Sequence, residues 1–156
     1  MKKRILLCIT AVICAMALTA CGGKKEKDVT VDVTKLAEDL TATVTSDTLS
    51  TVSADIMAST YFFDAEKIEE GTAALGSGAS ACEVAVIKCS DSGYVSEAED
   101  LFKTRVKNQS DLFADYNAPE VAKLDAALIK SAGNYVVLCV TDDTKAAEEV
   151  LKEAGF

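Results

Sequence analysis

The sequence predicts an α+β fold, with a four-stranded, mainly antiparallel sheet, helices on one face and short helices ahead of it. Two observations lead to this fold class. Strongly apolar segments at residues 82–89 and 135–141 have the composition of buried strands. Each is followed by a polar break and then by a stretch with the apolar spacing of an amphipathic helix. Strands and helices in this order favour an antiparallel sheet covered by helices.

Short helices are expected before the sheet. Apolar residues recur at helical spacing from Val33 to Val44, and Asp32 precedes them as an N-cap. Asp64 caps a later short helix in the same way. The segments predicted here are a helix through 33–44, a polar loop at 45–53, and short helices at 54–60 and 65–70.

Strands and longer helices alternate in the rest of the chain. Ser96 and Glu99 have the spacing of a capping box at the start of a long helix, which ends before Pro119. Gly133 and Asn134 form the turn of a hairpin. The segments predicted here are strands at 72–75, 82–89, near 124–131 and at 135–141, a long helix up to residue 116, and a last helix at 145–154 that is capped by Asp142 and Asp143 and closed by Gly155.

The two halves of this pattern resemble each other weakly. Residues 86–91 parallel 137–142, and residues 98–103 parallel 147–152. The sheet would then consist of two strand-strand-helix units. Chance is an equal alternative, because any strand followed by a capped helix gives a similar pattern.

Residues 1–20 have the layout of a secretory signal peptide, with a basic start and an apolar run at 5–18. The Leu-Thr-Ala-Cys ending at Cys21 resembles the lipobox of bacterial lipoproteins. That resemblance implies a diacylglycerol on the Cys21 thiol and removal of residues 1–20. The alternative is an uncleaved helix with a chance cysteine after it, although the run is shorter than the ~20 residues that span a bilayer.

The segment after Cys21 is charged and carries two glycines, so residues 21–31 are interpreted as the lipidated cysteine and a flexible tether. Residues 32–156 have the length of a single α+β domain. With the lipid attached, the protein would be extracytoplasmic, anchored to the outer leaflet of the cell membrane.

Charge and composition exclude several classes of function. Residues 29–156 carry 10 basic and 23 acidic side chains, whereas nucleic-acid binding needs clustered Lys and Arg. We therefore expect no nucleic-acid partner, and a cationic partner is the alternative to an acidic surface that only keeps the protein soluble. Histidine and tryptophan are both absent, which removes the commonest general base and metal ligand and a common anchor of binding sites. No cofactor is expected.

Three cysteines remain in the body of the chain: Cys82, Cys89 and Cys139. We expect buried free thiols, with a disulfide between Cys89 and Cys139 as the alternative if these two are neighbours across the sheet. Cys82 and Cys89 are seven positions apart and would point to opposite faces of one strand. No metal site is expected, because zinc sites need four ligands at short paired spacings.

Few residues are candidates for a functional site. Neighbouring carboxylates occur in several places, but adjacent side chains on a helix point apart and favour a solvated face. Arg105 and Gln109 interrupt the apolar side of the long helix, and Tyr116 and Asn117 lie at its end. They are interpreted as the edge of the apolar stripe or, taken together, as a recognition patch. No catalytic residue is predicted.

Several short segments in the body share their order and spacing with a known family. They are Ala58-Ser59-Thr60-Tyr61 before Asp64, Gly76-Ser77-Gly78-Ala79, Glu83-Val84-Ala85-Val86-Ile87-Lys88, Tyr116-Asn117-Ala118-Pro119-Glu120 and Gly133-Asn134-Tyr135-Val136-Val137. Together they resemble a family of Firmicutes lipoproteins known only as a domain of unknown function, DUF4358. The resemblance implies a lipid-anchored single-domain protein and no established activity, so it assigns no catalytic residue here.

These observations favour a non-catalytic binding or assembly module of the cell envelope, with an envelope protein as its partner. The alternative is a small carboxylate-dependent hydrolase that acts on cell-wall material. An enzyme should have a concave pocket with converging carboxylates, and a binding module should have a flat or grooved apolar surface.

Replacing Cys21 by serine tests the anchor. The hydroxyl of Cys21→Ser cannot form the thioether, so we expect the variant to lack the added acyl mass and to keep residues 1–20. Mass spectrometry of natively expressed protein measures both, with Cys82→Ser as the matched control that should be processed normally. An unmodified Met1 terminus in the wild-type protein would contradict the prediction.

Overall fold

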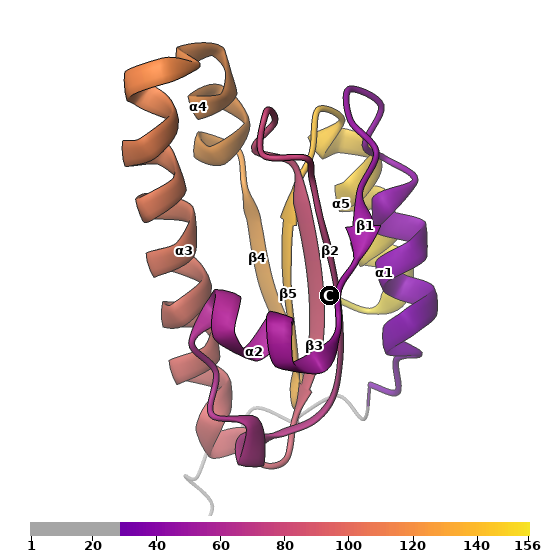
Figure 1. The fold of residues 1–156 in the computed structure, drawn as a ribbon. Coiled ribbons are helices and arrows are strands. Elements are labelled where there is room, and N and C mark those ends of the chain that lie inside the picture. Colours follow the sequence, from indigo (N-terminus) through magenta and orange to yellow (C-terminus); the bar gives the residue numbers. More distant parts are fainter. Residues whose placement is uncertain (1–28) are drawn as a thin grey trace, which may run out of the picture.

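The computed structural model describes residues 29–156. The predicted signal peptide, Cys21 and residues 22–28 of the predicted tether lie outside this range. The described part is α+β, and its sheet has five strands in the order β1-β2-β3-β5-β4 (Figure 1). All neighbouring strands are antiparallel. The strands are β1 (Ser50–Thr51), β2 (Ile68–Leu75), β3 (Glu83–Cys89), β4 (Leu128–Ala132) and β5 (Tyr135–Val140).

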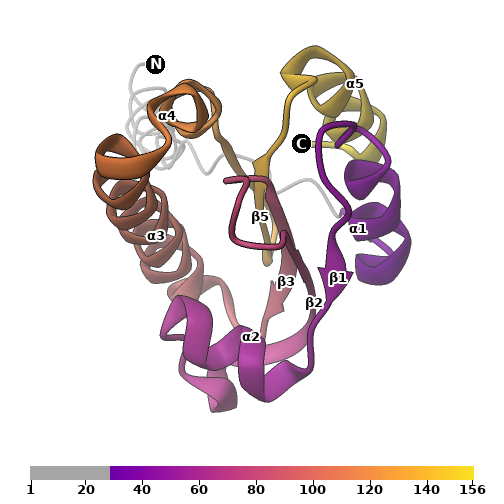
Figure 2. The same ribbon diagram turned by 45° about the horizontal axis from the view of Figure 1, so that its top comes forward.

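Helices pack against both faces of this sheet (Figure 2). One face carries α2, α3 and α4, and the other carries α1 and α5. The helices are α1 (Val33–Thr41), α2 (Ala54–Tyr61), α3 (Val95–Tyr116), α4 (Ala118–Asp125) and α5 (Thr144–Ala154), with two short 3-10 helices, η1 (Ala65–Lys67) and η2 (Ser92–Tyr94).

The expectation that helices cover only one face is therefore wrong, and the central strands give the reason. In β3, Ala85 and Ile87 point towards α2 and α3, while Val84 and Val86 point towards α1 and α5. Every residue of β5 is buried. A strand that is apolar on both sides has to be covered on both, because apolar side chains stabilise the fold only when they are removed from water.

The fifth strand, β1, lies where the sequence predicts a polar loop. Ser50 pairs with Leu75 and Thr51 with Ala74 along the outer side of β2. Both β1 residues are exposed. The four-stranded expectation fails here because a short edge strand with no buried side chain leaves no apolar signal in the sequence.

Two other segment predictions are corrected. The short helix expected at 65–70 ends after the three residues of η1, and the strand β2 begins at Ile68. The strand expected near 124–131 is present as β4, but it begins only at Leu128, and the helix α4, which was not predicted, precedes it and ends at Asp125. Pro119 explains the second difference, because it ends α3 and also lies in the first turn of α4, where a helix needs no N–H from that residue.

The predicted helix ends are partly confirmed. Asp32 and Asp143 accept hydrogen bonds from the first turns of α1 and α5, and Gly155 closes α5 with a left-handed φ of 100°. The capping box at Ser96 is not formed, because η2 leads directly into α3 and the helix already begins at Val95.

The two predicted strand-strand-helix units occur in the order of elements along the chain, but they are not related by symmetry in space. They are β2-β3-α3 and β4-β5-α5. The rotation that exchanges the antiparallel strands β3 and β5 would leave both helices on the same face. Instead α3 and α5 lie on opposite faces, so the repeat extends only to the order of the elements.

Phe62 closes α2 in an unusual conformation. Its φ of 61° is left-handed, and among residues 29–156 it is the only residue other than glycine with a positive φ. Its ring is 77% exposed. Phe62 therefore occupies a position that usually suits glycine, and its side chain gains little from burial.

Phe62→Gly should stabilise the fold. A side chain in the left-handed region costs on the order of 1–2 kcal/mol, and glycine relieves most of this cost. Urea unfolding should show a free energy of unfolding raised by about 1 kcal/mol. Phe62→Ala removes the same ring but keeps the Cβ atom and is the matched control; an equal gain in both variants would contradict the backbone explanation.

Candidate functional site

Arg105, a residue of the predicted recognition patch, forms a buried ion pair. Its Nη2 lies 2.8 Å from Oε2 of Glu83, and its Nε lies 3.1 Å and 3.2 Å from the two carboxylate oxygens. Glu83 is only 3% exposed. Burial raises the pKa of Glu83, and the hydrogen bonds from Arg105 work against this rise. The guanidinium of Arg105 thus compensates a carboxylate inside the domain.

Gln109 and Tyr61 surround this ion pair. With its amide oxygen turned towards Arg105, Gln109 accepts hydrogen bonds from Nη1 at 2.6 Å and Nη2 at 3.2 Å. The ring of Tyr61 lies beneath the guanidinium, with its centroid 5.9 Å from Cζ. The Tyr61 hydroxyl is buried and has no hydrogen-bond partner, and burial raises its pKa. The side chains of Arg105 and Gln109 thus form hydrogen bonds within the protein.

Tyr116 and Asn117 hold a loop at one end of the sheet. The Tyr116 hydroxyl donates to the carbonyl of Gly78 at 3.1 Å, and Nδ2 of Asn117 donates to the carbonyl of Ala79 at 3.1 Å. The four residues predicted as one patch therefore form two separate sets of contacts on the same side of the sheet.

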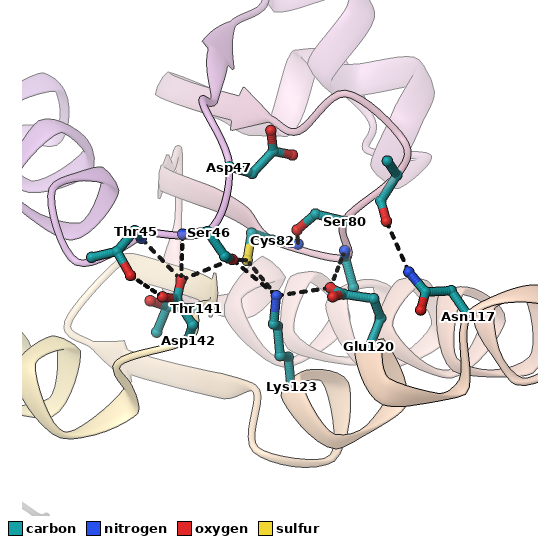
Figure 3. A network of polar contacts seen from close by, with 12 residues as sticks. Thr45, Ser46, Asp47, Ser80, Cys82, Asn117, Glu120, Lys123, Thr141 and Asp142 are labelled. Carbon is teal, nitrogen blue, oxygen red and sulfur yellow. Dashed lines mark hydrogen bonds and ion pairs between the residues drawn. The ribbon is translucent and has the colours of Figure 1, made fainter.

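A polar network centred on Lys123 of α4 joins the loops at this end (Figure 3). Its Nζ lies 3.0 Å from Oε2 of Glu120, 3.0 Å from Oγ of Ser46 and 3.7 Å from Sγ of Cys82. Glu120 in turn accepts from the backbone N–H of Ala81 at 2.9 Å. One side chain thus connects α4 to two loops that are distant in the sequence.

Asp142 extends the network to the end of β5 (Figure 3). Its carboxylate accepts from the backbone N–H of Thr45 at 3.0 Å and from both the N–H and the hydroxyl of Ser46, at 3.4 Å and 3.2 Å. Burial alone would raise the pKa of Asp142, but these hydrogen bonds and that of the Thr45 hydroxyl outweigh it and lower the pKa well below its usual range. The carboxylate is therefore ionised and fully used as an acceptor.

The pair formed by Ser46 and Lys123 has the distance of a nucleophile and its base, but Lys123 is in the wrong protonation state. Burial lowers the pKa of Lys123, while the hydrogen bond and charge of Glu120 raise it and prevail. A protonated ammonium cannot accept the proton of a serine hydroxyl. The network is thus suited to fixing loops rather than to activating Ser46.

The three cysteines of the described part are free and buried, as expected. Cys89 and Cys139 are not neighbours, because Cys89 faces α2 and α3 whereas Cys139 faces α1 and α5. Burial raises the pKa of Cys89 to about 11 and that of Cys139 to about 12. Both are therefore protonated and unreactive near neutral pH. Within residues 29–156 no group of three His, Cys, Asp or Glu side chains could hold a metal ion.

Two grooves flank the sheet on opposite faces. The first, of about 560 Å³, lies between α1 and α5 and has an apolar floor with an acidic rim. The second, of about 330 Å³, lies between α3, α4 and β4. Residues lining the first groove include Asp32, Leu36, Asp39, Val150 and Glu153, and those lining the second include Val106, Lys107, Leu124, Ala127 and Ile129.

Sequence reasoning missed both grooves and the Lys123 network. Each is made of residues from segments far apart in the chain, such as Ser46, Cys82 and Lys123. The only local signal was that Glu120 and Lys123 have the i,i+3 spacing of a helical ion pair, and it was missed because no helix was predicted after Pro119.

The fold and these sites define an α+β protein with an antiparallel sheet between two helical layers. The chain belongs to the family described as a domain of unknown function, DUF4358, which matches residues 42–141. The match covers all five strands together with α2, α3 and α4. Searches of curated proteins and of solved structures gave no match. Within residues 29–156 no helix has both the length and the apolar character to cross a membrane.

Arg105→Ala tests the buried ion pair. The variant leaves the Glu83 carboxylate buried without its partner, which costs about 3–5 kcal/mol of stability at neutral pH. Burial holds the pKa of Glu83 above its unfolded value, and loss of Arg105 raises it further. As the pH falls, Glu83 in the folded variant therefore takes up a proton at a higher pH than it does in the unfolded chain. The loss of stability caused by Arg105→Ala should shrink as the pH falls from about 7.5 to about 5.

Urea unfolding at both pH values measures this effect. Lys107→Ala is the matched control on the same helix, because Lys107 pairs with Asp111 in solvent and the pair adds little to stability. A deficit for Arg105→Ala that does not change with pH would contradict the assignment to Glu83.

Proposed function

We propose that the protein is a non-catalytic binding or assembly module of the bacterial cell envelope. In this proposal, the lipid on Cys21 anchors it to the outer leaflet of the cell membrane. The groove between α1 and α5 takes a cationic, partly apolar segment of an envelope protein. The observation that carries the proposal is the composition of this groove.

The groove combines an apolar floor with negative charge. Leu36, Val150 and Ala154 supply apolar surface, and the rim carries three carboxylates. The ammonium of Lys35 is 2.6 Å from Asp39 and neutralises that carboxylate. Asp32 keeps its charge while it caps α1, and Glu153 is the third carboxylate that can meet a cation. The excess of 23 acidic over 10 basic side chains in residues 29–156 adds a field of the same sign.

The position of the groove suits a tethered protein. Thr30 and Val31, the last two residues of the predicted tether, line it together with Asp32. About ten flexible residues have a typical reach of roughly 17 Å. A partner that emerges from the membrane or lies at its surface would therefore meet this groove within the reach of the anchor.

The two carboxyl groups with shifted pKa values, those of Glu83 and Asp142, do not favour the hydrolase alternative. Glu83 is buried against Arg105, and Asp142 is occupied by the hydrogen bonds of Thr45 and Ser46. Neither carboxylate lines one of the two grooves described above. Hydrolysis of wall fragments is therefore kept as an outcome of the test.

The proposal predicts that charge in the groove controls binding. A synthetic amphipathic peptide of lysine and leucine should bind the acylated full-length protein, as measured by calorimetry. The double variant Asp39→Lys, Glu153→Lys should weaken binding at least tenfold, since it places like charges opposite the peptide. Glu149→Lys, on the same helix but outside the groove, should leave the affinity within about twofold after correction for salt.

Two results would contradict this function. Equal weakening by Glu149→Lys and by the double variant would show that only net charge matters. Release of soluble fragments from purified cell wall by the wild-type protein would favour the hydrolase instead. In cells, photocrosslinking from position 153 should capture one defined envelope protein that position 149 does not capture.

A further inference from the structure

The strand β4 lies at the edge of the sheet, and its register shows which of its backbone groups are unpaired. The backbone N–H of Cys89 in β3 donates to the carbonyl of Asn134, so even-numbered residues around β5 turn their backbone towards β3. The odd-numbered residues of β5 face β4, where they oppose Leu128, Lys130 and Ala132. The N–H and C=O groups of Ile129 and Ser131 therefore point away from the sheet.

A groove runs beside this open edge. α3 lies alongside β4 for much of its length (Figure 1), and the space between them is the groove of about 330 Å³. Val106 and Leu124 supply apolar surface from the helices, and Ile129 supplies it from β4. An edge strand beside an apolar groove under a helix provides both parts of strand addition, namely backbone pairing and a pocket for alternate side chains.

Charge at the edge selects the occupant. Lys130 is exposed and, within residues 29–156, forms no ion pair. Pairing of two β4 strands centred on this residue would place two ammonium groups opposite each other, which is unfavourable. A carboxylate on the incoming strand would instead form a favourable cross-strand pair with Lys130. The edge thus discourages a second copy of the chain and favours an acidic strand.

We propose that β4 binds an extended peptide segment in which acidic and apolar residues alternate. The segment pairs with the free backbone groups of Ile129 and Ser131. Its apolar side chains enter the groove beside α3, and its carboxylate lies opposite Lys130. This site goes beyond the proposed function, because it is on the opposite face of the sheet from the groove between α1 and α5 and takes a partner of opposite charge.

The test uses a capped heptapeptide that alternates glutamate and valine, with full-length acylated protein in neutral detergent. Nuclear magnetic resonance should show slowed amide exchange at Ile129 and Ser131 when the peptide is present, and no change in α5. Ser131→Pro removes an N–H that the hairpin does not use, and edge strands tolerate proline. This variant should keep its unfolding temperature and lose at least tenfold in affinity.

Lys130→Glu provides a second variant that does not touch the backbone. It should weaken binding of the glutamate-valine peptide at least fivefold and strengthen binding of a lysine-valine peptide. Lys152→Glu on α5 is the matched charge control and should alter neither affinity beyond about twofold. The proposal is overturned if the glutamate-valine peptide does not bind, if the slowed amide exchange falls on strands other than β4, or if Lys130→Glu and Lys152→Glu change the affinities alike. None of these three outcomes depends on the lysine-leucine peptide, so the two proposals can fail separately.

Discussion

The strands β3 and β5 bury both of their faces, and most of the architecture follows from covering them. Val84 and Val86 need α1 and α5 on one side, while Ala85 and Ile87 need α2 and α3 on the other. One helical layer would leave half of these side chains in water, at a cost of about 25 cal/mol for each Å² of apolar surface. The order of elements along the chain is the same in both halves, but the helices that follow β3 and β5 separate to opposite faces to meet this requirement.

Polar groups at the margins of these layers fix how the layers meet. Glu83 begins a central strand yet is buried, and Arg105 reaches from α3 to compensate its charge. Lys123 and Asp142 bring together the loops between α1 and β1, between β2 and β3, and after β5 (Figure 3). Buried polar groups cost free energy unless every partner is in place, so such contacts favour one arrangement of the loops over its alternatives.

The two ends of the sheet, and likewise its two faces, therefore differ in the elements and grooves that they carry. Figure 1 shows the start of α1 at one end of the sheet and the interlinked loops at the other. A tether attached before α1 would hold the first end nearer the membrane and present the loop end away from it. The two grooves lie on opposite faces of the sheet, so occupation of one does not obstruct the other. A module that joins a cationic and an acidic partner is consistent with this arrangement.

The sequence by itself determined the α+β class, the hairpin at Gly133-Asn134, the burial of the thiols and the capped ends of α1 and α5, because each depends on local spacing or composition. It also indicated the family, through the resemblance of several short segments to DUF4358. Only the tertiary structure decided the fifth strand, the helix at Pro119, the second helical layer, the role of Arg105 and the grooves. The physical reason is that these features are contacts between distant segments. An exposed edge strand leaves no apolar pattern, and a buried arginine such as Arg105 has the same local signature as one at the edge of a helix stripe. Its role became visible only when β3 brought Glu83 to within hydrogen-bond distance.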